Sequence, residues 1–354
     1  MATQRPLSDT PHDRPMPRTA LLTRTPPGGA GVDLDALLNG YRRSRVLFAA
    51  LELELFEYTC APRSGAEIEH RLGLHRRATR PFLDALVGLE LLDRQDGPRD
   101  VYHNTATTNR HLVSSSAWYL GADLLAGGRR SYRHWNWLTE ALRSGEPQNE
   151  LADGFDGTQR PDPQFCRRFV TFERFAELID LGTRWWSVVA TDADLAMPLA
   201  RAHPNSIGQV LTTRAAAPGV RGQLVLAGLD DRVAVAECDV FIDTIAPSEV
   251  YLVDSLRDYT PTERERLLER VRCALARDGV LVVVDDVIDD ERRLNPPALL
   301  SSLDALIEGS ACLGYTASEF DAWCRVAGFA GTEIAPIAGA ASAAIAYTNQ
   351  GDIS

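Results

Sequence analysis

Two residues of opposite charge follow apolar runs in the C-terminal half of the chain. Arg257 comes shortly after EVYLVD (249–254), and Asp285 lies near the end of GVLVVVDD (279–286). If these runs are parallel strands, both side chains lie where functional sites collect, at the carboxyl edge of the sheet. Arg257 could donate hydrogen bonds to a carbonyl or a developing oxyanion, while Asp285 fixes the guanidinium or moves a proton. The alternative is a buried ion pair that only joins two elements.

His134, in the run RRSYRHWNW, is a second candidate for catalysis. An imidazole on a helix above the site could bind or protonate a substrate, although a lone His beside two tryptophans is more often a packing residue. Phenylalanines at 165, 169, 172 and 175 share one face of a helix, which is either a core stripe or the lid of an apolar pocket. The residues expected to contact substrate are Phe165, Phe169, Phe172, Trp137 and Asp258.

Composition excludes several classes of function. A formal net charge of −12 over 354 residues argues against a nucleic-acid partner, because phosphate binding needs clustered Lys and Arg. No apolar run approaches the roughly 18 residues of a membrane span, and the first twenty residues lack the apolar core of a secretion signal. The six scattered cysteines form no CxxC pair. We therefore expect a cytoplasmic protein with reduced thiols, no metal, and no nucleic-acid or membrane partner.

The N-terminal half of the chain must position His134 and the phenylalanines that follow it. Residues 1–32 are rich in Pro, Thr, Arg and Gly and predict a disordered tail. Residues 33–114 predict a winged-helix unit: a helix from 34 to 55, a helix capped by Ser64, a third helix, and a β-like wing. We expect this unit to serve dimer packing and not DNA binding. Residues 115–182 predict an aromatic-rich helical linker or lid.

The C-terminal part, residues 183–350, predicts an α/β fold. Short β-branched runs alternate with helical stretches, which is typical of a parallel sheet with crossover helices. Thr260 and Glu263 predict a capping box at the start of a helix that runs to Gly279. The last strand, which includes 343–347, is expected to close the sheet edge as part of an antiparallel hairpin.

Four segments, in this order, resemble class I S-adenosylmethionine (SAM)-dependent O-methyltransferases. They are LAMPLARAHP (195–204), DDRVAVAECDVF (230–241), YLVDSLRDY (251–259) and EFDAWCRVAGF (319–329). The resemblance extends from about residue 33 to 348. It implies a Rossmann-like methyltransferase domain preceded by a winged-helix dimerisation domain, and an intertwined homodimer.

Three departures from the family pattern concern the donor site and the base. The glycine cluster of the family's donor loop is replaced by SVVATDA (187–193), whose Val189 and Thr191 are expected to fill the methionine space. Thr212-Thr213-Arg214 replaces the acid that holds the ribose, so Asp239 and Phe241 on the adenine side are expected to be vestigial. Arg257 stands where the family has its base, 28 residues (285 − 257) before Asp285, and an arginine cannot take up a proton.

These departures predict an enzyme of natural-product metabolism that has lost methyl transfer and needs no cofactor, with SAM binding weak or absent. It would catalyse a cyclisation, isomerisation, dehydration or hydroxylation of an aromatic or polyketide-like molecule. The alternatives are a divergent SAM-dependent O-methyltransferase and a catalytically silent partner that dimerises with an active enzyme.

Overall fold

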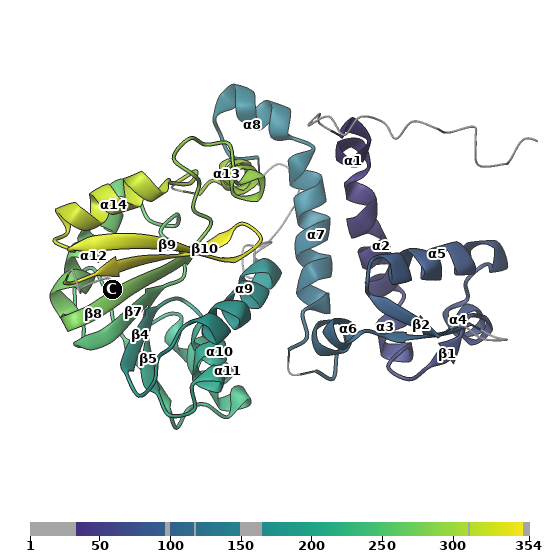
Figure 1. Ribbon diagram of the computed structural model, residues 1–354, viewed down its shortest axis with the longest axis horizontal. Coiled ribbons are helices and arrows are strands. Elements are labelled where there is room, and N and C mark those ends of the chain that lie inside the picture. The colour runs from purple at the N-terminus through teal and green to yellow at the C-terminus, as the bar shows by residue number, and fades with distance from the viewer. Residues whose placement is uncertain (1–32, 96–99, 117, 149–164, 311, 350–354) are drawn as a thin grey trace, which may run out of the picture.

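The computed structural model describes residues 33–95, 100–116, 118–148, 165–310 and 312–349 (Figure 1). A helical N-terminal domain with a small three-stranded sheet precedes a Rossmann-like α/β domain with a seven-stranded sheet. The predicted fold class is thereby confirmed. The tail predicted for residues 1–32 lies outside the described residues.

The N-terminal domain packs helices against one short sheet. Its elements are α1 (Leu34–Asn39), α2 (Tyr41–Glu52), α3 (Leu55–Tyr58), β1 (Arg63–Ser64), α4 (Gly65–Leu72), α5 (Arg76–Gly88), β2 (Leu92–Gln95) and β3 (Val101–Asn104), with sheet order β1-β3-β2. The prediction of one helix over 34–55 was wrong: the chain breaks at Gly40 and again at Glu54, whose φ of +53° is left-handed. The capping role of Ser64 is confirmed, with Glu67 completing the box.

Four helices connect the two halves of the chain. They are α6 (Ala106–His111), α7 (Gly121–Trp135), α8 (Leu138–Ser144) and α9 (Phe165–Leu178). The long helix α7 stands between the two halves in Figure 1 and contacts α2, α9 and α13. An ion pair of 3.0 Å between Arg110 and Glu173 also joins α6 to α9.

The large sheet has strand order β6-β5-β4-β7-β8-β10-β9. Its strands are β4 (Trp185–Val189), β5 (Ile207–Thr212), β6 (Val233–Glu237), β7 (Ser248–Val253), β8 (Leu275–Asp285), β9 (Gly331–Ala338) and β10 (Ala341–Tyr347). Strands β4 to β8 are parallel, and the hairpin β9-β10 adds antiparallel to β8, as predicted. The accompanying helices are α10 (Ala196–Ala202), α11 (Ala217–Ala227), α12 (Pro261–Ala274), α13 (Pro296–Glu308) and α14 (Ala317–Val326).

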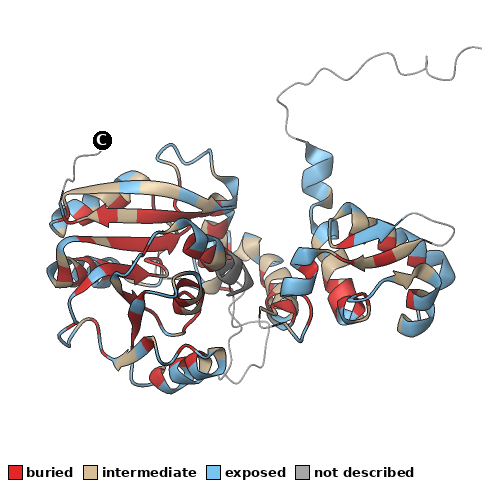
Figure 2. Ribbon diagram, turned by 60° about the horizontal axis from the view of Figure 1, so that its bottom comes forward, coloured by how far each residue is buried: buried red, intermediate tan, exposed pale blue. Residues whose placement is uncertain are grey.

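Alternate residues of each strand enter two cores on opposite faces of the sheet. Val188 and Val210 pack with α9, α10 and α11, whereas Val189 and Leu211 pack with α12 and α14. Most of the sheet is therefore buried (Figure 2). Position 208 must be glycine because the ring of Trp186 lies directly against its backbone. A Cβ there would lie 2.2 Å from that ring.

The junction between α12 and β8 differs from the sequence-based prediction. The helix ends at Ala274 and not at Gly279, and the strand begins at Leu275. Leu275 is buried in the α12 core and pairs with Ser248 of β7, so the chain must already be extended there. No helix among the described residues is long and apolar enough to cross a membrane.

Candidate active site

Carboxylates gather at the carboxyl edge of the parallel strands, where each strand gives way to a loop. The acidic residues at or just after these strand ends are Asp192 and Asp194 (β4), Asp239 (β6), Asp254 (β7), and Asp285 and Asp286 (β8). In α/β sheets this edge is where ligands bind. Among the described residues, no three His, Cys, Asp or Glu side chains are arranged as metal ligands.

Arg257 and Asp285 form a buried ion pair at this edge. The Nε of Arg257 lies 2.9 Å from Oδ1 of Asp285, and the two side chains are 8% and 1% exposed. The Oδ2 of Asp285 accepts hydrogen bonds from the backbone N–H of Leu256 and the hydroxyl of Ser255. Asp285 therefore ties the end of β8 to the loop after β7. The structure thus brings the two residues together, and their catalytic role remains a prediction.

A second carboxylate and a serine complete this buried cluster. The guanidinium donates to the hydroxyl of Ser301 on α13 at 2.8 Å and lies 3.5 Å from Asp286. Burial alone would lower the pKa of Arg257, but the charges of Asp285 and Asp286 raise that pKa above its ordinary value. Arg257 is consequently a permanent cation and cannot accept a proton.

Tyr315 borders the same cluster. Its side chain is completely buried, and burial together with the charge of Asp285 raises the pKa of its phenol well above the ordinary value. The phenol is therefore neutral at physiological pH. It packs against Phe320 and Trp323, which fixes its ring beside the ion pair.

His134 lies near the C-terminus of α7 and is 1% exposed. Its Nδ1 lies 2.9 Å from Oε1 of Glu308 on α13, and Arg130 pairs with the other carboxylate oxygen. The neighbouring Trp135 donates its indole N–H to Asp304, also on α13, at 2.5 Å. The structure therefore places His134 against the helix that also carries Ser301.

The predicted substrate contacts separate into three groups. Phe172 is 1% exposed and packs in the core beneath the sheet, which supports the core interpretation of the phenylalanine stripe for this residue. Trp137 is 43% exposed and Asp258 is also exposed, so neither faces an enclosed cavity. The side chains of Phe165 and Phe169 lie outside the described part of the structure.

The loop after β4 does not need the glycines whose absence suggested a lost donor site. Among the described residues, only Glu54, Glu90 and Arg292 combine a side chain with positive φ, so no position of this loop demands glycine. Val189 is buried in the α12 core and Thr191 is exposed. Val189 thus has a packing role in the core, and the expectation that it and Thr191 fill the methionine space stays a prediction.

Thr212 offers a hydroxyl at the end of β5. It is 3% exposed, and its Oγ1 finds no hydrogen-bond partner among the described residues. A buried hydroxyl without a partner is costly, and bonding to a ligand would remove that cost. Thr212 is thus suited to a sugar hydroxyl, although it can hold fewer hydrogen bonds than a carboxylate.

Phe241 and Asp239 border the edge at β6. The ring of Phe241 makes an edge-to-face contact with Tyr259 at 5.8 Å, and Asp239 accepts the backbone N–H of Phe241 at 2.9 Å. Burial, with the nearby charges of Asp254 and Asp258, raises the pKa of Tyr259 above its ordinary value. The ring of Phe241 is the kind of aromatic side chain on which a purine ring packs.

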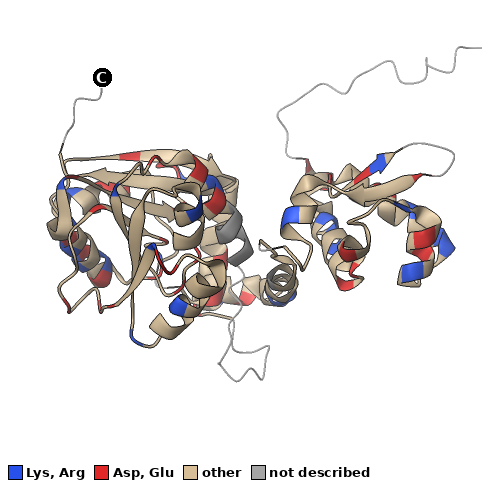
Figure 3. Ribbon diagram, turned by 90° about the horizontal axis from the view of Figure 1, so that it is seen from below, with Lys and Arg blue, Asp and Glu red and all other residues tan. Residues whose placement is uncertain are grey.

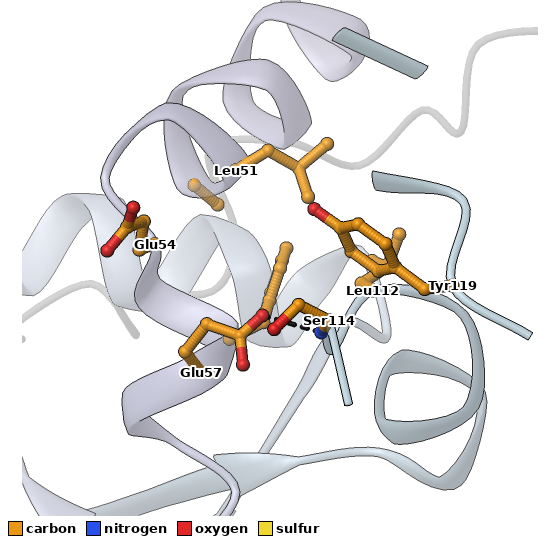
Figure 4. A pocket seen from close by; sticks show the side chains of 8 residues that line it. Leu51, Glu54, Glu57, Leu112, Ser114 and Tyr119 are labelled. Atoms are coloured by element: carbon orange, nitrogen blue, oxygen red, sulfur yellow. Dashed lines mark hydrogen bonds between the residues drawn. The ribbon is translucent and has the colours of Figure 1, made fainter. Parts of the chain in front are cut away.

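A separate hollow of about 220 Å³ lies in the N-terminal domain (Figure 4). Leu51, Leu112 and Tyr119 line it together with two acids, and Glu57 accepts the backbone N–H of Ser114 at 2.6 Å. No residue of this hollow belongs to the strand ends of the large sheet. The hollow is therefore separate from the candidate active site.

Sequence reasoning missed the partners supplied by α13 and the unpaired hydroxyl on β5. Ser301 and Glu308 are seven residues apart, which puts both on one helix face. That spacing was visible in the sequence, but which residues this face meets depends on the fold. Asp286 was also missed, although it directly follows the predicted Asp285.

Comparisons with known proteins assign the chain to a family. Residues 36–114 match the O-methyltransferase dimerisation domain, and residues 160–330 match the O-methyltransferase domain. The tetracenomycin polyketide synthesis 8-O-methyl transferase of Streptomyces glaucescens is 30% identical, covering 88% of this chain and 95% of that protein. The N,N-dimethyltransferase OxyT of Streptomyces rimosus is 31% identical, covering 87% and 94%. The fold matches human N-acetylserotonin methyltransferase in complex with SAM, with TM-score 0.71, 21% identity, and coverage of 91% and 100%.

These relatives overturn two expectations from the sequence. Both relatives are named methyltransferases, and this chain aligns with nearly the whole length of each. The prediction that methyl transfer had been lost was therefore wrong. The prediction of an enzyme without a cofactor was also wrong, since the relatives are methyltransferases and the human protein of the same fold was solved in complex with SAM. The error arose because missing glycines were taken as missing space, whereas the loop reaches its conformation without left-handed residues. The chain belongs to the O-methyltransferase family, with its dimerisation domain followed by its catalytic domain.

Proposed function

We propose that this chain is a SAM-dependent methyltransferase that methylates a hydroxyl group of an aromatic, polyketide-like small molecule. One observation carries the proposal: a chain of this family presents acidic side chains at the ends of neighbouring parallel strands. SAM carries a sulfonium, an ammonium, a diol and an amine, all of which are positive or donate hydrogen bonds. Acidic acceptors around them are the complementary chemistry.

Several residues would hold SAM. Phe241 and Asp239 would border the adenine, Thr212 would bond a ribose hydroxyl, and the loop 190–194 would lie along the methionine part. When bound, SAM supplies an electrophilic methyl group.

The Arg257 cluster would orient the acceptor side of the site. The ion pair with Asp285 holds the guanidinium rigidly at the ends of β7 and β8, with Ser301 fixing its other side. A fixed cation can stabilise an oxygen that gains negative charge while its proton leaves. Taking the proton itself requires another group.

Methylation of an amine is the second candidate. A neutral amine carries a free electron pair, so its attack does not need a base at position 257. OxyT, a 31% identical relative, is named an N,N-dimethyltransferase. The absence of a proton acceptor at Arg257 is the specific observation that favours this acceptor class.

We also infer that the protein works as a homodimer, organised as a dimerisation domain (33–114), a helical linker (115–182) and a catalytic domain (183–350). The match to the O-methyltransferase dimerisation domain supports the dimer. Leu34, Leu37, Leu38 and Tyr41 lie on one face of α1 and the start of α2 and are all more than half exposed. In Figure 3 the helices of this domain carry both acidic and basic residues, which fits packing better than binding to nucleic acid.

Two measurements test the proposed function. Titration calorimetry with SAM and with its demethylated product should give binding with micromolar dissociation constants. Incubation with SAM and a panel of hydroxynaphthalenes, hydroxyanthraquinones and aromatic amines should release the demethylated product and add 14 mass units to one acceptor. Product only from amines would select the second candidate. Absence of SAM binding would refute both.

A further inference from the structure

A carboxylate fixes the tautomer of His134. Nδ1 of the imidazole lies 2.9 Å from Oε1 of Glu308, and an ionised carboxylate can only accept hydrogen bonds. Nδ1 must therefore carry the hydrogen. Arg130, one turn earlier on α7, pairs with the second oxygen of Glu308 and holds the carboxylate in place. This arrangement leaves the lone pair of a neutral imidazole on Nε2.

The Nε2 atom is buried and has no hydrogen-bond partner within the described residues. Buried polar atoms are nearly always bonded, because leaving one unbonded destabilises the fold. A purely structural histidine between two helices would gain stability from a partner on this nitrogen. An unpaired lone pair is instead what a group that takes a proton from a bound molecule requires.

Helix α13 links His134 to the Arg257 cluster. Ser301, which accepts from Arg257, and Glu308, which holds His134, are two turns apart on one face of α13, about 10 Å along its axis. The backbone carbonyl of Arg257 also accepts the N–H of Cys312, just beyond the end of this helix. A cation and an unpaired imidazole nitrogen therefore border the same helix, α13, whose place beside α7 Figure 1 shows.

We propose that His134 is the catalytic base of this enzyme and that Glu308 is its positioning residue. The inference rests on the proposed O-methylation and supplies the proton acceptor that Arg257 cannot provide. The O–H bond of the acceptor breaks, its electron pair stays on oxygen as the nucleophile, and the proton moves to Nε2. The resulting imidazolium is stabilised by Glu308 and returns its proton to solvent after the product leaves.

Burial of Nε2 sets a condition on this step. An acceptor can reach the nitrogen only if the groups that cover it move, as they do in sites that close over their substrates. Once enclosed, the hydroxyl and the imidazole are shielded from water, which strengthens the hydrogen bond between them. The same helices would then carry both the proton acceptor and the contact to Arg257.

Nitrogen NMR of the full-length protein labelled at histidine tests the tautomer without turnover. We expect the signal that disappears in His134→Gln to show a protonated Nδ1 and an unprotonated Nε2. In Glu308→Gln the carboxamide can also donate, so the tautomer should become mixed. A neutral His134 protonated at Nε2 in the wild-type protein would overturn the proposal.

Steady-state kinetics with the best hydroxylated acceptor of the panel tests the role in catalysis. His134→Gln should lower kcat by about 100-fold or more, the range of a lost general base, while the KM for acceptor and the calorimetric Kd for SAM change little. Glu308→Gln should lower kcat less and should mix the tautomers, which a merely structural loss would not do. A more acidic, fluorinated acceptor should restore part of the His134→Gln rate, because it ionises without help.

The control is His70→Gln, an exposed histidine of α4 in the N-terminal domain, which should keep wild-type kcat. If His134→Gln fails to fold, Glu308→Gln carries the test alone. Wild-type kcat in folded His134→Gln would overturn the assignment of the base while leaving the proposed function intact. No methylation of any panel acceptor by the wild-type protein would overturn the proposed function and this inference with it.

Discussion

At the scale of single residues, removing the unpaired hydroxyl of Thr212 should affect SAM affinity and protein stability in different directions. Thr212→Val removes a buried hydroxyl that has no partner among the described residues, so the SAM-free protein should unfold at the same temperature or higher. SAM affinity should fall about 5- to 10-fold, the loss of one hydrogen bond of about 1 kcal/mol. Thermal unfolding and calorimetry measure the two effects. Thr212→Ser, which keeps the hydroxyl, should retain SAM affinity; equal affinity of the Val and Ser variants would show that Thr212 does not bond the ribose.

The Arg257 cluster makes the opposite prediction, because its members are paired. Arg257→Met leaves the buried carboxylates of Asp285 and Asp286 without their cation, and should lower the free energy of unfolding by about 3–5 kcal/mol. Arg292→Met, which breaks an exposed ion pair with Glu319, should cost less than about 1 kcal/mol. Urea unfolding of the SAM-free protein measures both. Equal costs would show that water reaches the Arg257 site.

The residue scale also shows what the sequence could reveal of the site. Arg257 and Asp285 were predictable because each follows an apolar strand, and strand ends of a parallel sheet converge. Glu308 was not predictable, because its contact with His134 depends on how α13 lies against α7. The prediction for the loop 187–193 was misleading because it took the loss of glycines as the loss of the loop's conformation. No residue of this loop has a positive φ, so its backbone does not need glycine.

At the scale of elements, local signals predicted the helix starts well. Thr260 and Glu263 form the predicted capping box of α12, and Ser64 forms one at α4. The end of α12 was predicted five residues too late, because burial of Leu275 and its pairing with β7 are tertiary effects. Helix breaks at Gly40 and Glu54 were missed for a related reason: apolar spacing continued through them.

The capping box of α12 gives a prediction with a pH dependence. Hydrogen bonds from the hydroxyl and the backbone N–H of Thr260 lower the pKa of Glu263 below its ordinary value. A carboxylate with a lowered pKa stabilises the fold above its unfolded pKa, and this contribution is lost as pH falls through the folded pKa. Thr260→Ala should therefore destabilise the fold at neutral pH and do so less in acid. Unfolding at pH 7 and pH 3.5 checks this against Thr262→Ala, an exposed neighbour that should change little; a cost independent of pH would contradict it.

At the scale of the whole molecule, helix α7 contacts both the dimerisation domain and the catalytic half. This helix packs on α2 of the dimerisation domain and on α9 and α13 of the catalytic half. A change in the packing of α7 therefore reaches both the dimerisation domain and α13, which carries Glu308 and Ser301. The proposed base would thus depend on the assembly, although neither it nor its carboxylate belongs to the dimerisation domain.

The exposed apolar face of α1 gives the prediction at this scale. Leu34, Leu37 and Leu38 are each at least 70% exposed, a cost that a second copy of the chain would remove by covering them. The double variant Leu37→Glu/Leu38→Glu should therefore shift the protein from dimer to monomer in light scattering at micromolar concentration. Leu226→Glu, an equally apolar and 91% exposed site on α11, is the matched control and should stay dimeric. If both variants remain dimers, α1 lies outside the interface; if the α1 variant is monomeric and also loses kcat, the path through α7 couples assembly to catalysis.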